Sequence, residues 1–226
     1  EDSNLMSIEG VSEKTGILLL ITATTAIATA MRMPEAGALI LLGVIGGFII
    51  AMMVIFSGSM NPMLICTYAA FEGLALGGIT WIFEGYLEMP GIGILAALLT
   101  FLILGVMIAI YRAGLIQWDR NTAIAVTSAL GAIVLIYLIS IIGSFLGFEI
   151  PYIHGSGPIG IAFSLFVVGI GALCLVADFD FIEKGVERGA PKQLEWRAAF
   201  GLMVTLIWLY LEILKLLAKI AAHTRR

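Results

Sequence analysis

Long runs of apolar residues, separated by short polar stretches, divide the chain into seven segments. Each run has about the 20 residues that a helix needs to cross the hydrocarbon core of a bilayer. The runs cover approximately residues 15–31, 37–56, 61–83, 91–111, 122–148, 158–182 and 194–222. None shows the short apolar–polar alternation of a membrane β-barrel. The pattern predicts an all-α, polytopic membrane protein folded as a bundle of seven transmembrane helices.

The polar stretches between these segments are too short to hold a soluble domain. We expect residues 15–222 to form one transmembrane domain, preceded by a polar N-terminal tail at 1–14 and followed by a basic C-terminal tail at 223–226. The N-terminal residues lack the basic start of a signal peptide. Because the loops are short, sequential helices are expected to run in opposite directions.

Composition supports a lipid bilayer as the environment of the chain. Hydrophobic residues make up 61% of the sequence and charged residues only 12%, whereas soluble domains carry about 25% charged residues. The sequence has no nucleotide-binding glycine loop and no metal-binding spacing of Cys and His. His154 and Ser156 lie in a predicted loop, which we interpret as a turn rather than a nucleophile site. We therefore expect no enzymatic activity, no nucleic-acid partner and no cofactor other than a bound or transported ion.

Positively charged side chains predict the orientation of the chain in the membrane. The side that holds the N-terminus carries Lys14, Arg112, Arg120, Lys184, Arg188, Lys192 and Arg197. The opposite side carries Arg32, Lys219, Arg225 and Arg226. Since cytoplasmic loops have the excess of Lys and Arg, we expect the N-terminus to be cytoplasmic.

Charged residues inside a span are functional candidates by default. Glu212 lies well inside the last segment, and Lys215 follows it on the same helical face. A local ion pair between the two is one interpretation. A role for Glu212 in sharing a proton or binding a cation is the other.

Three further acids lie in the spans. Asp178 and Asp180 lie near the end of the sixth segment, on different faces because residues two apart do not share one. We interpret Asp180 as a solvated helix end, whereas Asp178 is a candidate to face the bundle. Glu72 lies near the middle of the third segment without a basic neighbour in the sequence. It is either a hydrogen-bonded structural residue or part of an ion or proton path.

Two stretches of the chain carry a resemblance to a known family. The sequence ADFDFIEKGVERGAPKQLEWRAAFGLMVTLIWLYLEILKLLA and the earlier NPMLICTYAAFEGLALGGIT resemble the bacterial branch of the transmembrane Bax-inhibitor-motif family. The resemblance implies a central seventh helix wrapped by the other six, an inner-membrane location, and a pH-sensitive calcium leak. The expected partners are the ions Ca²⁺ and H⁺, with other membrane proteins as a separate alternative.

The resemblance further implies a sensor made of two carboxylates, one on each of the last two helices. The matching positions are Asp178 and Glu212, which would also be the ligands of a bound calcium ion. Two carboxylates within hydrogen-bond reach cannot both be ionised cheaply, so they would share a proton. Losing that proton would bring repulsion or admit a divalent cation, and pH would bias a two-state bundle.

The sequence departs from the family pattern in two ways. It has no Lys or Arg between Gly37 and Arg112, where the family places a basic residue that pairs with the acid of the sixth helix. Lys184 and Arg188 are the candidates to replace it.

The second departure concerns spacing. A tight hairpin at Gly189–Pro191 would set Asp178 opposite about Leu202 rather than Glu212. The resulting offset is about 15 Å at 1.5 Å per residue. The pair therefore requires residues 183–195 to form a longer loop or a bent helix.

Three other functions are compatible with the sequence. A proton-coupled transporter would use Glu72 and Glu212 as relay sites. A non-enzymatic regulator would act by binding other membrane proteins. Seven helices and Lys215 also suggest a retinal protein, but the Glu212–Lys215 spacing and the lack of matching acids in the third segment argue against it.

Overall fold

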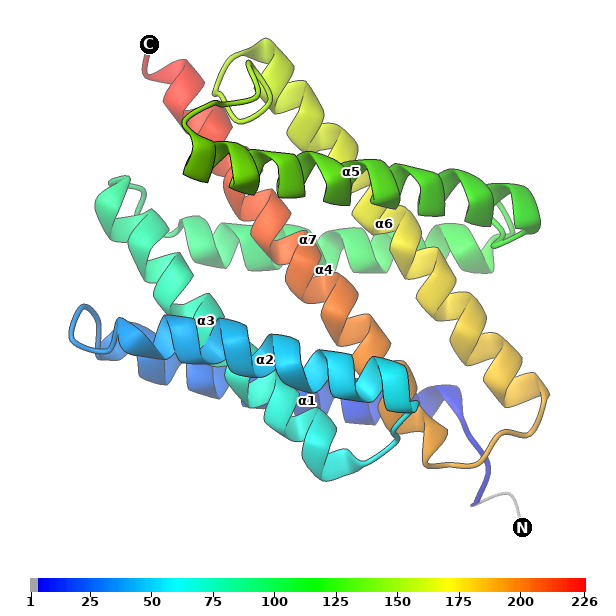
Figure 1. Ribbon diagram of the computed structural model, residues 1–226. Coiled ribbons are helices and arrows are strands. Elements are labelled where there is room, and N and C mark those ends of the chain that lie inside the picture. Colours follow the sequence, from blue (N-terminus) through cyan, green and yellow to red (C-terminus); the bar gives the residue numbers. More distant parts are fainter. Residues whose placement is uncertain (1–3) are drawn as a thin grey trace. The chain divides into compact units, whose positions relative to one another are not determined.

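The computed structural model describes residues 4–226, without the side chain of Tyr86. The helices in this part of the chain are α1 (Ile8–Met31), α2 (Ala38–Ser57), α3 (Pro62–Tyr86), α4 (Ile92–Arg112), α5 (Arg120–Leu146), α6 (Pro158–Glu187) and α7 (Leu194–Thr224) (Figure 1). All seven are long and apolar enough to cross a membrane. Residues 4–226 form no strand beyond an isolated bridge between Leu5 and Pro191. The predicted all-α fold with seven membrane-spanning helices is confirmed.

Helix α1 begins seven residues earlier than the hydrophobic pattern suggests, at Ile8. Ser7 caps it, because the Ser7 side chain accepts a hydrogen bond from the backbone N–H of Gly10 at 3.0 Å. Such a cap satisfies one of the four N–H groups that a helix start leaves without a partner. Residues 8–14 of the expected polar tail are therefore the first turns of α1.

The helices belong to two compact units. The first comprises the residues up to Gly93 together with Asp180–Ile207. In this unit α3 packs against both α1 and α2 (Figure 1). Gly77 makes the close approach to α1 possible, since a Cβ atom at this position would lie 2.0 Å from the carbonyl oxygen of Ala26. Small residues permit such contacts between membrane helices.

The first half of α7 also packs in the first unit. The ring of Phe200 meets that of Tyr68 on α3 edge-on, with 4.9 Å between the ring centroids. Arg197 donates a hydrogen bond from its guanidinium to the carbonyl oxygen of Val54, near the end of α2, at 2.9 Å. Helices α2, α3 and α7 are thus joined near the first turns of α7.

The second unit comprises Ile94–Phe179 and Trp208–Arg226. Its core lies between α5 and α6, where Val126 and Ile133 pack with Val167 and Ile170. Partly buried aromatic side chains surround this core, among them Tyr137, Phe163 and Trp208. The second half of α7 contributes the polar residues described below.

Helix α7 takes part in both units, and residues 188–193 connect it to α6. Of the seven spans, α7 is the most buried: 61% of its most apolar 18-residue stretch is buried within the protein. The central position that the family resemblance implies for this helix stays a prediction. The connection is short, and it does not supply the long loop or bent helix that a pairing of Asp178 with Glu212 requires.

Candidate functional site

A polar cluster in the second unit is centred on Glu212 of α7. The Glu212 side chain is buried, with 4% of the residue exposed. The phenol of Tyr137 on α5 donates a hydrogen bond to its Oε1 at 2.8 Å. The ammonium group of Lys215 lies 3.1 Å from the same oxygen. Glu212, Tyr137 and Lys215 therefore form one connected group, which we call the Glu212 cluster.

Lys215 completes this cluster by contacting Tyr137 as well. Its Nζ donates a hydrogen bond to the phenol oxygen at 3.2 Å and lies 4.6 Å from the centroid of the tyrosine ring. A cation over an aromatic face is attracted by the negative charge of the π system. The structure contains the local Glu212–Lys215 ion pair, one of the two interpretations that the sequence left open, and Tyr137 extends it to a second helix.

The second carboxylate oxygen of Glu212 has a different environment. Glu212 Oε2 is buried and has no hydrogen-bond partner among the described residues. A buried polar atom without a partner costs free energy, about 1–3 kcal/mol. The carboxyl group therefore retains one position at which a proton or a cation can be accommodated.

His154 lies beside the Glu212 cluster, in the loop between α5 and α6. Its ring centroid is 6.3 Å from that of Tyr137, and its Nε2 lies 2.7 Å from Oγ of Ser140. The imidazole and the phenol are thus neighbours in one polar region. The sequence interpretation of this loop as a simple turn did not anticipate the contact with Tyr137.

The electrostatic surroundings of His154 favour its neutral form. Partial desolvation lowers the pKa of the imidazole below its usual range, although the residue is exposed, and the ammonium groups of Lys219 and Lys215 lower it further. Glu149 and Glu212 act in the opposite direction and do not prevail. Protonating His154 would place a third positive charge next to two lysines.

Lys219 of α7 forms hydrogen bonds with the loop between α5 and α6 and with the first turns of α6. Its ammonium group donates to the carbonyl oxygens of Ile153 and Gly160, at 3.0 and 3.2 Å, and to Oγ of Ser164 at 2.7 Å. All three hydrogens of the ammonium group are therefore engaged. The sequence identifies Lys219 only by its charge and does not single out Tyr137.

Asp178 and Asp180 lie on α6 as the sequence predicts, but they belong to different units. Asp180 forms an ion pair with Lys184 one turn later, at 2.9 Å. Lys184 was one of two candidates to form an ion pair with Asp178, and in the structure it forms one with Asp180 instead. Asp178 lies one turn after Cys174 on the same helix.

The contacts between α6 and α7 in the second unit fix their register. Ser164 lies opposite Lys219, and a Cβ atom at Gly171 would lie 2.7 Å from a methyl carbon of Leu209. Between these two contacts, Glu212 of α7 lies at the level of about residue 169 of α6. Asp178 is about nine residues further along, or about 14 Å at 1.5 Å per residue. The assignment of Asp178 and Glu212 as a pair stays a prediction that requires a change in this register.

Glu72 lies on α3 in the first unit, where it faces Gly47 of α2. A Cβ atom at Gly47 would lie 2.5 Å from Glu72 Oε1, so the absence of a side chain at Gly47 makes room for the carboxylate. Within residues 4–226, no hydrogen bond or ion pair engages the Glu72 side chain. Its role as an ion or proton site stays a prediction.

A second buried carboxylate, Glu195, was not anticipated from the sequence. It lies in the first turn of α7 and is fully buried. Glu195 Oε1 lies 2.5 Å from Nζ of Lys14, and Oε2 accepts hydrogen bonds from the N–H and Oγ of Ser7 at 2.8 and 3.2 Å. Lys192 Nζ lies 3.4 Å from Oε2. Its sequence position suggests only an ordinary first-turn acid.

Glu195 therefore joins the start of α1 to the start of α7. Gly10 permits the contact, because a Cβ atom there would lie 2.2 Å from both carboxylate oxygens. Backbone hydrogen bonds reinforce it, from Met6 N–H to the Ala190 oxygen at 2.8 Å and from Lys192 N–H to the Asn4 oxygen at 3.0 Å.

A metal centre built from side chains is not found in the part of the chain that the structure describes. No group of three or more His, Cys, Asp or Glu residues there is placed to hold a metal ion. Calcium in a protein cage takes six to eight oxygen ligands. The proposed calcium ligands Asp178 and Glu212 stay a prediction for an ion in transit.

Comparison with known proteins places the chain in a family. The family described as Bax inhibitor 1 like matches residues 1–222. No curated protein matches the chain.

Proposed function

The chain belongs to the Bax inhibitor 1 like family and is an integral membrane protein, and we propose that it is a pH-sensitive leak for cations, chiefly calcium. The observation that carries the proposal is the Glu212 cluster. It contains a buried carboxylate in a membrane-spanning helix. One oxygen of this carboxylate is hydrogen-bonded and ion-paired, and the other has no hydrogen-bond partner among the described residues. Intramembrane ionisable residues of this kind mark ion and proton pathways.

The Glu212 cluster joins α5 to α7 most strongly when Glu212 is ionised. The carboxylate then attracts Lys215 and accepts the hydrogen bond of Tyr137. Charge-assisted hydrogen bonds are stronger than neutral ones by about a factor of two. In this state the two helices are held in one arrangement.

Protonation of Glu212 weakens that arrangement. The carboxyl group loses its charge, and Lys215, whose side chain is 39% exposed, loses the attraction that holds it beside Glu212. The contact between α5 and α7 then rests on the tyrosine hydroxyl and apolar packing. A change of protonation in this way biases a two-state element. We expect cation flux to rise as the pH falls.

The proposal depends on Glu212 first and on Asp178 second. The family resemblance assigns Asp178 the role of the second carboxylate. In the register described above, Asp178 influences the leak independently of the Glu212 cluster unless α6 slides along α7.

Reconstitution into liposomes tests the proposed function. The purified protein is inserted into calcium-loaded vesicles, and efflux is followed from about pH 8 to about pH 5. We expect efflux above that of empty vesicles, increasing toward acidic pH. Efflux equal to that of empty vesicles at every pH would contradict the proposal.

One observation favours a second candidate function, a proton-coupled transporter. Glu72 is a half-buried carboxyl group in a span, without a hydrogen-bonding partner among residues 4–226. Such a group takes up and releases protons as relay residues do. Proton uptake that depends on an added substrate, and is lost in Glu72→Gln, would favour this function over the leak.

A further inference from the structure

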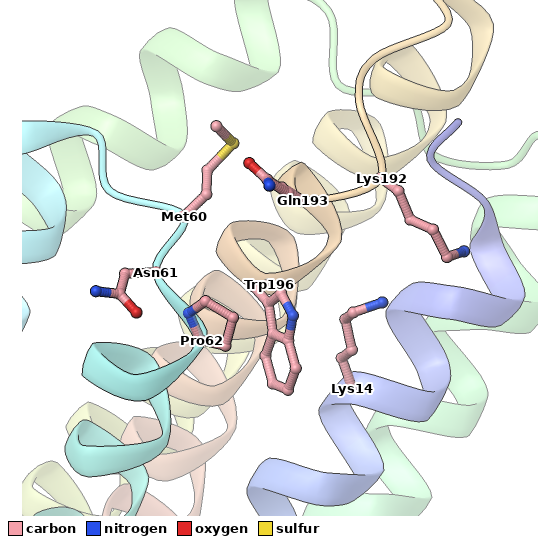
Figure 2. Close-up of a pocket in the computed structure, with 7 residues that line it drawn as sticks. All are labelled: Lys14, Met60, Asn61, Pro62, Lys192, Gln193 and Trp196. Atoms are coloured by element: carbon pink, nitrogen blue, oxygen red, sulfur yellow. The ribbon is translucent and has the colours of Figure 1, made fainter. Parts of the chain in front are cut away.

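A cleft opens at one end of the first unit, where α1, α3 and α7 begin. Its volume is about 520 Å³, within the usual range of small-molecule sites. The lining residues are Lys14, Met60, Asn61, Pro62, Lys192, Gln193 and Trp196 (Figure 2). None of them takes part in the Glu212 cluster.

The charge of this cleft is positive. Its lining includes two lysines and no acid. The acid that pairs with both lysines, Glu195, is fully buried behind them. One carboxylate against two ammonium groups leaves one positive charge in excess, and the Lys192 side chain is 46% exposed. An anion entering the cleft would therefore meet uncompensated positive charge.

Neutral polar side chains, Asn61 and Gln193, also line the cleft (Figure 2). Asn61 Oδ1 accepts a hydrogen bond from the N–H of Met63 at 3.0 Å. This contact orients the amide, whose nitrogen points away from Trp196 and the lysines (Figure 2). The amide of Gln193 lies on the same side of the cleft as Met60 (Figure 2). The Gln193 amide and the two ammonium groups suit an oxyanion with several acceptor oxygens.

The remaining wall of the cleft is apolar. The Trp196 indole lies between the lysines and Pro62 (Figure 2), and Nζ of Lys14 is 5.6 Å from the centroid of the Trp196 ring. Tryptophan is enriched at the level of lipid headgroups. The helices that begin here, α1, α3 and α7, place the cleft at the end of their membrane spans.

We propose that this cleft binds the phosphate group of an anionic ligand, with the headgroup of an anionic phospholipid as its source. Lys14 and Lys192 neutralise the phosphate, Gln193 donates a hydrogen bond to one of its oxygens, and Trp196 packs against the glycerol and upper acyl chain. Basic pockets between transmembrane helices hold lipid headgroups in this manner. The site is independent of the proposed leak.

Native mass spectrometry of the full chain in detergent tests this proposal. The delipidated protein is titrated with phosphatidylglycerol, with phosphatidylcholine of the same acyl chains, and with inorganic phosphate. The cleft variants are Lys192→Gln and Gln193→Glu, of which the second adds a repelling charge without removing any contact of Glu195. Lys184→Gln is the matched control, since Lys184 carries the same charge but pairs with Asp180 outside the cleft. Circular dichroism checks that each variant is folded.

We expect phosphatidylglycerol to be retained in preference to phosphatidylcholine. Each cleft variant should weaken that retention about fivefold, the effect of about one charge near a membrane surface, while Lys184→Gln leaves it unchanged. Displacement of the lipid by inorganic phosphate at comparable concentration would support the phosphate site and identify its source as a soluble ligand. Equal retention of both lipids, or retention that neither cleft variant changes, would overturn the proposal.

Discussion

Tyr137 of α5 donates a hydrogen bond to Oε1 of Glu212 of α7 across 2.8 Å, although the two residues are 75 positions apart in the sequence. Together with the hydrogen bond from Lys215 to the same phenol oxygen, this contact connects α5 to α7 through polar groups. Oε1 of Glu212 therefore has hydrogen-bond partners, whereas Oε2 has none among the described residues. The pH response that we propose depends on this relationship.

Replacing Tyr137 with Phe removes the donor and keeps the ring. We expect a loss of stability of about 1–2 kcal/mol, because a buried carboxylate oxygen loses a hydrogen bond. Lys215 remains as a partner of Glu212, so the leak should persist with a shifted pH response. Thermal unfolding in detergent and calcium efflux measure the two effects. Tyr152→Phe is the control, since Tyr152 is 72% exposed; equal behaviour of both variants would contradict the assigned role of Tyr137.

The lowered pKa of His154 should make the stability of the folded protein depend on pH. Partial desolvation and two nearby lysines lower the pKa of its imidazole below the usual value of about 6.5. The unfolded chain therefore takes up a proton at a higher pH than the folded protein does, and stability falls as the pH drops through about 6.5. We expect His154→Gln to reduce this part of the loss on acidification.

The measurement for His154 is the melting temperature of the detergent-solubilised protein at about pH 7.5 and about pH 5.5. His223 is the other histidine of the chain and lies exposed in the last turn of α7. His223→Gln should therefore keep the pH dependence of the wild type. The same pH dependence in His154→Gln as in the wild type would show that another group is responsible.

Glu195 is expected to contribute more to stability than any exposed acid. Replacing it with Gln leaves Lys14 without its counter-charge and weakens the hydrogen bonds to Ser7. Removing one partner of a buried pair costs about 3–5 kcal/mol, and 15% exposure of Lys14 places the expected loss at the lower end. Urea or thermal unfolding measures it, with Glu187→Gln, an exposed acid of α6, as the control. A loss below about 1 kcal/mol would indicate a pair that solvent screens effectively.

The relation between Asp178 and Glu212 is open to a double-mutant cycle. With an offset of about 14 Å along the helices, Asp178→Asn and Glu212→Gln should change the pH response independently, so that the double variant shows the sum of both effects. Strong coupling between the two substitutions would instead support the carboxylate pair that the family resemblance implies. The measured quantity is the pH of half-maximal calcium efflux in the four proteins.

The sequence predicted the helices well because their signal is local. Runs of about 20 apolar residues determine a membrane span with little help from the rest of the chain. The start of α1 was misplaced because Ser7 and Glu195 determine it, and these residues are distant in sequence. The same holds for the site. The partner of Glu212 within α7, Lys215, follows from helical periodicity, whereas Tyr137 and Lys219 bind residues on other segments.

For some residues the sequence indicates a polar helix face but does not identify the residues that this face contacts. Tyr137 and Ser140 are polar groups one turn apart in a span that is otherwise apolar. This spacing marks a polar face but does not identify what it meets. The buried state of Glu195 has no such signal, because an acid in a first turn is ordinarily solvated and favoured by the helix dipole.

The pH profile of calcium efflux from liposomes that contain Glu212→Gln tests the central claim most directly. Glutamine keeps the size of the side chain and cannot ionise, so it mimics the protonated carboxyl group. We predict that the wild type leaks increasingly as the pH falls, and that Glu212→Gln leaks at a nearly constant, elevated rate from about pH 8 to about pH 5. A variant that retains the pH dependence of the wild type would contradict the role of Glu212 as the group that controls the leak.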